Sequence, residues 1–318
     1  MAPNRFLRPL GIAAILLTMP GFHAGSQTAP ADNEQEPVYR LSVDVNLVVL
    51  HATVRDRRGG FAADLREENF AVYEDGVPQH IRLFQHEDVP VTVGLVVDHS
   101  GSMRPKLRDV TAAARTFVRF SNPEDQMFVV NFNEMVSMGL PATTRFSNDS
   151  AVLGDAIWNA PADGETALYD ALVKALARLQ EGRWDKKVLL VISDGGDNAS
   201  SHSVEQVTGI AERSSALIYT IGIFDEADTD QRPRVLRHLA LATGGAAFFP
   251  GQAGEVASVC ERIAREIRNQ YTIGYVPTTV RKGVYRNIRV VARGAGHDKL
   301  SVRTRTGYVS GDARAEQN

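Results

Sequence analysis

The spacing of hydrophobic residues divides this chain into three blocks. Between residues 39 and 88, apolar and polar positions alternate with the two-residue period of a β-strand, and Asp75-Gly76 separates two such runs as in a hairpin. From residue 89 to 270, short apolar runs alternate with amphipathic helical patterns, and from residue 271 the two-residue alternation returns. The pattern therefore predicts a β segment, an α/β domain and a second β segment.

The middle block predicts a mostly parallel, Rossmann-like sheet with helices on both faces. The expected strands span residues 93–97, 127–132, 188–192, 217–223 and 246–249, with a short edge strand at 136–140. The expected helices span residues 107–120, 167–179, 204–213, 235–242 and 254–269. Because the connection between two parallel strands must cross a face of the sheet, this alternation of strands and helices favours an open α/β fold.

Each of the two β segments is too small to bury a stable core alone. About four strands are expected in the first and about three in the second, which together have the size of a β-sandwich. We therefore expect one small β-sandwich-like domain formed from N- and C-terminal segments, with two independent appendages as the alternative. The alternation also shifts phase near Leu47 and Val48, which predicts a bulge or a strand that crosses between sheets.

The start of the chain predicts export. Arg5 and Arg8 precede an apolar stretch at residues 10–19 that is too short to span a membrane, and small residues follow at 24–26. We expect a periplasmic or secreted protein with no membrane span after signal cleavage; an uncleaved anchor is the alternative. The predicted divisions are a signal peptide at 1–25, a linker at 26–37, β segments at 38–88 and 271–309, the α/β domain at 89–270 and a disordered tail at 310–318.

Composition narrows the classes of function. The chain has 318 residues, a formal net charge of -3 and no long run of one charge, which argues against nucleic-acid binding. Cys260 is the only cysteine, so an internal disulfide is excluded. The helical spacing of Cys260 with Val256, Ile263 and Ile267 predicts that the thiol acts as a small buried hydrophobic group.

Five oxygen-bearing side chains occupy predicted strand ends and helix starts in the α/β block. They are Asp98, Ser100 and Ser102 after one strand, Thr166 before a helix and Asp194 after another strand. Ligands of open α/β sheets bind outside the carboxyl ends of the strands, so we expect these three loops to meet there. Carboxylate and hydroxyl oxygens are the donors that a hard divalent cation prefers, and we predict a metal site.

These loops resemble a known family. An Asp-x-Ser-x-Ser sequence at 98–102, Gly-x-Thr-Ala-Leu at 164–168 and Ser-Asp-Gly at 193–195 are similar to the metal-ion-dependent adhesion site (MIDAS) of von Willebrand factor type A domains. The resemblance extends over residues 89–270. The flanking β segments, the second of them rich in tyrosine, resemble those of a bacterial subgroup of these proteins.

The resemblance implies a role for each predicted ligand. Ser100, Ser102 and Thr166 are expected to bind the metal directly, and Asp98 and Asp194 to bind it directly or through water. One departure is Glu165, where the family often has a small neutral residue, and its role is left open.

Each of these residues also has a structural interpretation, because Asp, Ser and Thr are common in turns and at helix N-caps. The joint pattern favours the metal site. Hydroxyl ligands are neutral, so a bound cation keeps much of its charge and a coordination position for an Asp or Glu of a partner protein. We expect Mg²⁺, with Mn²⁺ or Ca²⁺ as alternatives, in a non-enzymatic adhesion or protein-binding module.

Two other classes of function stay open. A metal-dependent hydrolase needs a general base, for which Glu165 is the only candidate near the site, and no Gly-x-Ser-x-Gly, P-loop or His-Glu-x-x-His pattern occurs. His99 is expected to face solvent or line the rim of its loop. An envelope scaffold or assembly factor with a structural metal is the other class. Its contact surface would be formed by Tyr271, Tyr275, Tyr285 and Tyr308, although their alternation favours packing within a sheet.

Overall fold

The computed structural model describes residues 47–224, 231–278, 282–294, 296 and 299–311. The expected signal peptide and linker lie outside these residues. Of the expected tail at 310–318, only residues 310 and 311 are described. Among the described residues, no helix combines the length and the apolar character that crossing a bilayer requires.

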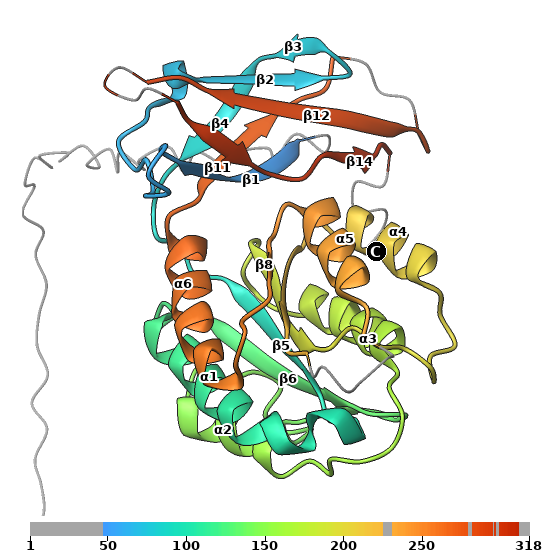
Figure 1. Ribbon diagram of the computed structural model, residues 1–318. Coiled ribbons are helices and arrows are strands. Elements are labelled where there is room, and N and C mark those ends of the chain that lie inside the picture. The colour runs from blue at the N-terminus through green and yellow to red at the C-terminus, as the bar shows by residue number, and fades with distance from the viewer. Residues whose placement is uncertain (1–46, 225–230, 279–281, 295, 297–298, 312–318) are drawn as a thin grey trace, which may run out of the picture. The chain divides into compact units, whose positions relative to one another are not determined.

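A six-stranded sheet forms the centre of the α/β block (Figure 1). Its spatial order is β10-β9-β8-β5-β6-β7, and every neighbouring pair is parallel except β6 with β7. The strands are β5 (Thr92–Asp98), β6 (Gln126–Phe132), β7 (Val136–Met138), β8 (Lys187–Ser193), β9 (Leu217–Gly222) and β10 (Ala247–Phe248). Strands β5, β8 and β9 are buried at every position, which is why they are continuous apolar runs in the sequence.

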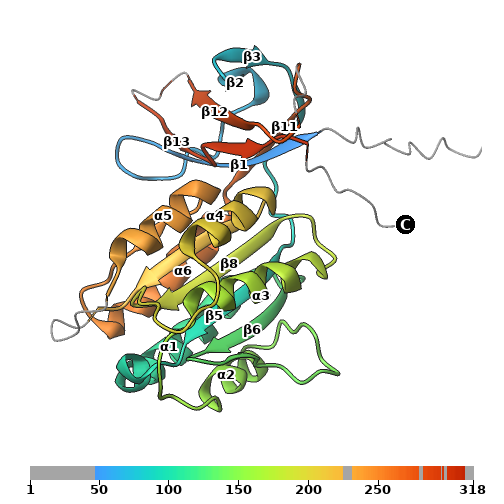
Figure 2. The same cartoon turned by 90° about the vertical axis from the view of Figure 1, so that its right-hand side faces the viewer.

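Helices cover both faces of this sheet, with α1 and α6 on one side and α3, α4 and α5 on the other (Figures 1 and 2). The helices are α1 (Leu107–Phe120), α2 (Ser150–Trp158), α3 (Leu168–Gln180), α4 (Val204–Arg213), α5 (Pro233–Thr243) and α6 (Val256–Arg268). The expected Rossmann-like α/β fold is confirmed.

Local sequence signals explain where several of these helices begin and end. Helix α4 starts with a capping box, in which Ser203 and Gln206 each bond the other's backbone N–H. Helix α5 has Pro233 in its first turn and ends at Gly244, whose φ of 85° is the left-handed conformation that glycine adopts most readily.

Two four-stranded antiparallel sheets contain the remaining strands, in the orders β13-β1-β11-β4 and β14-β12-β2-β3. The strands are β1 (Val48–Arg55), β2 (Phe70–Glu74), β3 (Val77–Gln79), β4 (Ile81–Gln85), β11 (Tyr271–Tyr275), β12 (Tyr285–Ala292), β13 (Ser301–Arg303) and β14 (Gly307–Val309). In both sheets, strands that precede the α/β block pair with strands that follow it, and one hydrophobic core contains residues of both. The expected β-sandwich built from two segments is confirmed, and the alternative of independent appendages is wrong.

The predicted hairpin turn is present, but the strand after it changes sheet. Asp75 and Gly76 have φ values of 48° and 81°, as a two-residue hairpin turn requires. Strand β3 pairs with β2 in one sheet, and β4 pairs with β11 in the other, so the crossing lies at His80. The bulge or strand crossing near Leu47 and Val48 was predicted from an alternation that starts at residue 41, and residues 41–46 lie outside the described ones.

The scaffold alternative placed four tyrosines on a contact surface, and for two of them this placement is wrong. Tyr271 and Tyr275 are fully buried, and only Tyr285 is markedly exposed. The Tyr271 hydroxyl donates to the carbonyl of Ala62 at 2.7 Å, and that of Tyr275 donates to Glu74 at 2.7 Å. These side chains fill the sandwich core and satisfy buried polar groups.

Buried Glu266 of α6 connects the α/β block to the sandwich. Its carboxylate accepts a hydrogen bond from the hydroxyl of Tyr219 in β9 at 2.8 Å. It also pairs with Arg55 of β1, at 2.8 Å, and with Arg303 of β13. The side chain of Glu266 is fully buried, so its charge depends on these two guanidinium groups.

Candidate metal site

The predicted ligands lie at the carboxyl edge of the central sheet. Asp98 is the last residue of β5, and Asp194 directly follows the neighbouring strand β8. Strand β5 continues through α1 to β6 on one side, whereas β8 continues through α4 to β9 on the other. The site therefore lies at the point where the direction of winding reverses, the usual position for ligands of this fold.

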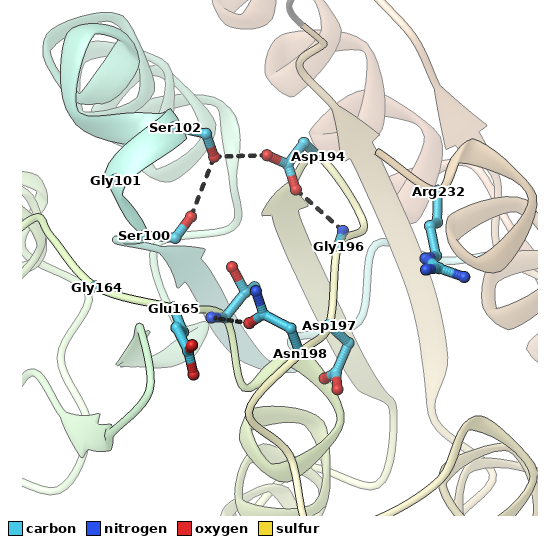
Figure 3. A pocket seen from close by; sticks show the side chains of 11 residues that line it. Ser100, Gly101, Ser102, Gly164, Glu165, Asp194, Gly196, Asp197, Asn198 and Arg232 are labelled. Atoms are coloured by element: carbon cyan, nitrogen blue, oxygen red, sulfur yellow. Dashed lines mark hydrogen bonds between the residues drawn. The ribbon is translucent and has the colours of Figure 1, made fainter. Parts of the chain in front are cut away.

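The oxygens of the first and third loops are in direct contact (Figure 3). The Ser102 hydroxyl donates to Asp194 Oδ2 at 2.7 Å and lies 3.2 Å from the Ser100 hydroxyl. The other oxygen of Asp194, Oδ1, accepts the backbone N–H of Gly196 at 3.0 Å. The loops thus hold three potential ligands within hydrogen-bonding distance of one another.

Asp98 is fully buried and held by two hydrogen bonds. Its Oδ1 accepts the backbone N–H of Ser100 at 2.8 Å, and its Oδ2 accepts the hydroxyl of Ser193 at 2.7 Å. Burial raises the pKa of Asp98 to about 6, and the neighbouring charge of Asp194 acts in the same direction. A nearby cation would favour the ionised form of both carboxylates.

Thr166 does not cap a helix. Helix α3 begins at Leu168 with Ala167 as its N-cap, and the side chains of Asp197 and Ser200 accept the first-turn N–H groups of Tyr169 and Asp170. The Thr166 backbone N–H instead donates to Asn198 Oδ1 at 2.8 Å. The side chain of Thr166 is 8% exposed and lines the same cavity as Ser100, Ser102 and Asp194. The N-cap interpretation is therefore wrong, and its hydroxyl is available to a ligand.

These residues fit a hard divalent cation. Adjacent ligands of an octahedral cation with bonds of about 2.1 Å lie about 3 Å apart, which matches the observed 2.7 and 3.2 Å. All of the donor atoms are oxygens. No three His, Cys, Asp or Glu side chains of the described residues form a group that could hold a metal, so the hydroxyls are needed to complete the ligand set.

The cavity above these residues has a volume of about 220 Å³. Besides the four predicted ligands already placed there, its lining includes Gly101, Gly164, Glu165, Gly196, Asp197, Asn198 and Arg232. Small-molecule pockets usually have volumes of about 300–1,000 Å³. This cavity is suited to an ion, a few waters and one short polar group.

The structure corrects one expectation and adds residues that the sequence did not reveal. His99 is 1% exposed, so the expectation that it faces solvent or the rim is wrong; its pKa is lowered, mainly by burial. Arg232 joins the site because its backbone N–H donates to the carbonyl of Asp194 at 3.1 Å. Nothing in the sequence near Arg232 indicates this contact, because it depends on the end of β8 meeting the start of α5.

Comparisons with known proteins agree with this geometry. Residues 93–196 match the model of the von Willebrand factor type A domain family, and no curated protein matches the chain. A von Willebrand factor type A structure from Catenulispora acidiphila is similar, with a TM-score of 0.50 and 15% identity, over 83% of this chain and 73% of that one.

A second similar structure is proximal thread matrix protein 1 from the mussel byssus. Its TM-score is 0.50 and its identity 18%, over 61% of this chain and 50% of that one. A further structure of the same protein, described as having a zinc-occupied MIDAS motif, has a TM-score of 0.50 and 17% identity, over 61% and 49%. At such identities, the likeness shows a shared fold.

Proposed function

We propose that the α/β block of this chain, in which residues 93–196 match the von Willebrand factor type A domain family, binds a protein partner outside the cytoplasm through a divalent cation. The proposed ligands are Asp98, Ser100, Ser102, Thr166 and Asp194. One observation carries the proposal: hydroxyls and a carboxylate from separate loops lie 2.7–3.2 Å apart at the opening of a small cavity.

Two kinds of side chain would hold the ion. Asp98 and Asp194 provide two negative charges, and the three hydroxyls provide neutral donors. A bound Mg²⁺, or Mn²⁺ or Ca²⁺ in its place, would supply a positive centre with room for one outside carboxylate. An Asp or Glu of a partner protein is the group that satisfies both the charge and the size of the cavity.

Two further observations support this proposal. The byssus matrix protein of the same fold has a MIDAS motif that holds zinc, which favours a divalent cation here. The sequence at the start of the chain favours export, so the partner is expected in the periplasm or outside the cell. A hydrolase is less well supported, because the cavity is small.

The test is retention of envelope proteins by the immobilised chain in Mg²⁺ and in chelator. We expect a partner to be retained in Mg²⁺, released by chelator and not retained by Asp98→Ala. Asp109→Ala is the matched control, because Asp109 is an exposed aspartate at the start of α1. Full retention by a folded Asp98→Ala protein would contradict the proposal.

A further inference from the structure

One side of the cavity rim is acidic. Glu165 lines the cavity, and its side chain is exposed. The carboxylate of Glu134 lies beside it, because Glu134 Oε2 accepts the backbone N–H of Glu165 at 3.1 Å. Within the described part of the chain, neither carboxylate pairs with a cationic side chain. Two acidic side chains on adjoining loops, neither with a cationic partner among the described residues, favour a positive group arriving from outside.

The β6–β7 turn is fixed onto the loop that carries Thr166. The backbone N–H of Ala167 donates to the carbonyl of Asn133 at 2.7 Å, and Asn133 Nδ2 donates to the carbonyl of Asp163 at 3.1 Å. The same turn presents Met135, which is 71% exposed. Met135 directly follows Glu134, and an apolar thioether on the same turn as a carboxylate suits a long basic side chain, whose stem is apolar and whose head is charged.

The opposite side of the rim is basic. Figure 3 shows Glu165 beside Gly164 on one side of the cavity and Arg232 beyond Gly196 on the other. Arg232 is exposed, and no described acidic side chain forms an ion pair with it. Its backbone is bonded to the carbonyl of Asp194, which fixes its position relative to the predicted ligands.

The two sides stay charged when a cation is bound. A divalent cation carries two positive charges, and Asp98 with Asp194 carries two negative charges, so the ion and these two carboxylates have no net charge and do not cancel the charges of the rim. The rim then has the carboxylates of Glu134 and Glu165 on one side and the guanidinium of Arg232 on the other. The cavity lining also includes Asp197, whose carboxylate accepts the Tyr169 backbone N–H and the Ser200 hydroxyl. A partner carboxylate therefore meets the cation itself, and on either side of it the partner meets fixed charges of opposite sign.

We propose that this rim selects the partner segment and sets its direction. The segment presents the metal-binding carboxylate between a basic side chain, which lies against Met135, Glu134 and Glu165, and a second acidic side chain, which pairs with Arg232. This inference rests on the proposed function and adds the chemistry of the residues on either side of the carboxylate. A basic residue on the wrong side meets Arg232 and is rejected.

Short synthetic peptides test the inference directly, whichever protein the natural partner is. The probes are acetylated and amidated hexapeptides with one aspartate and with lysine, glutamine or glutamate on either side of it. Peptides with asparagine in place of the aspartate are the controls. Binding to the full chain loaded with Mn²⁺ is measured by the paramagnetic relaxation of peptide protons, which detects weak complexes. We expect the peptide with lysine on one side and glutamate on the other to bind about tenfold more tightly than the peptide with the reverse order, since each surface charge pair changes affinity about two- to fivefold.

Charge reversal assigns each preference to a side chain. Glu165→Lys is expected to abolish or invert the preference for lysine, and Arg232→Glu to invert the preference for glutamate. Met135→Ser is expected to weaken the lysine peptide alone. Glu68→Lys, an exposed change of equal charge in the β-sandwich, controls for net charge. Mn²⁺ uptake is measured for every variant.

Each outcome has a distinct meaning. Preferences that follow the two charge reversals support the inference. Aspartate-dependent binding with no preference for order, or a preference that survives both reversals, overturns it and leaves the proposed function standing. A wild-type chain that takes up no Mn²⁺, or that relaxes aspartate and asparagine peptides equally, overturns the proposed function and the inference together.

Discussion

Thr166 shows how a single side chain is made available to a ligand. A threonine just before a helix commonly caps it, but here Ala167 occupies the N-cap position, Thr166 lies one residue further out, and Asn198 bonds the Thr166 backbone. The hydroxyl is thus left for the cavity. Ser100 is similar: it stands at the N-cap of the short 3-10 helix Gly101–Lys106, and its side chain makes no capping bond there.

Thr166→Val is predicted to weaken cation binding about tenfold or more, since about 1.4 kcal/mol of lost ligand interaction corresponds to a tenfold change. The fold is expected to stay intact, because valine has the same shape. Thr166→Ser retains the hydroxyl and is expected to bind nearly as well as the wild type. Competition titration with Mn²⁺ measures these affinities.

Thr208→Val is the matched control, because the Thr208 hydroxyl is bonded to the Val204 carbonyl inside α4, away from the site. Equal cation affinity in Thr166→Val and the wild type would show that Thr166 is not a ligand.

At the scale of elements, the regular periodicity of the α/β block made its elements predictable. The five predicted helices agree with the structure to within two residues at each end, because each presents a broad apolar face to the sheet. Helix α2 was missed, since its buried face is short and it leaves Trp158 55% exposed. Its one clear signal is Asp149, whose side chain accepts the backbone N–H groups of Ala151 and Val152.

The β segments were harder to predict than the helices. Strand β14 was missed because it has only three residues, Gly307–Val309. The change of sheet at His80 follows from pairing with β11, which is nearly two hundred residues further along the chain. No local sequence pattern predicts this change of sheet.

Glu266→Ala is predicted to destabilise the protein by about 3–5 kcal/mol, because it leaves the guanidinium groups of Arg55 and Arg303 partly buried beside each other without their carboxylate. Denaturant unfolding measures the change. Glu261→Ala on the same helix is the control: its pair with Arg265 is at the surface, and a loss within about 0.5 kcal/mol is expected. Similar losses in the two variants would mean that Glu266 does not hold α6 to the sandwich.

At the scale of the whole molecule, the sequence was sufficient to predict the fold class and to predict which loops lie together. The three loops converge because parallel strands end at one edge of a sheet, which is a general rule. Arg232, Glu134 and Met135 were not predicted to belong to the site, since their positions depend on tertiary contacts. The metal-binding roles and the domain limits, such as 89–270 for the α/β domain, remain predictions.

The stability of the molecule is predicted to depend on Lys186 in alkaline solution. Burial lowers the pKa of Lys186 from 10.5 to about 8, against the opposing charges of Asp125 and Asp88. Between pH 8 and 10.5 the unfolded chain therefore binds more protons than the folded one, so the free energy of unfolding contributed by this group rises with pH. From pH 8 to 10 the gain is about 2 kcal/mol.

Lys186→Met removes the titrating group while keeping a long apolar side chain. The stability difference between the wild type and Lys186→Met, measured by denaturant unfolding, is expected to shift by that amount in favour of the wild type as pH rises. Tyrosines titrate equally in both proteins and cancel. A difference that is the same at pH 8 and pH 10 would contradict a lowered pKa.

Calorimetric titration of Mg²⁺, Mn²⁺ and Ca²⁺ into the purified chain tests the central claim most directly. Binding of one ion per chain is predicted for the wild type, with loss of binding in both Asp98→Ala and Asp194→Ala and no change in Asp109→Ala. Absence of Mg²⁺, Mn²⁺ and Ca²⁺ uptake by the folded wild-type chain, or equal uptake by the Asp98 and Asp194 variants, would contradict it.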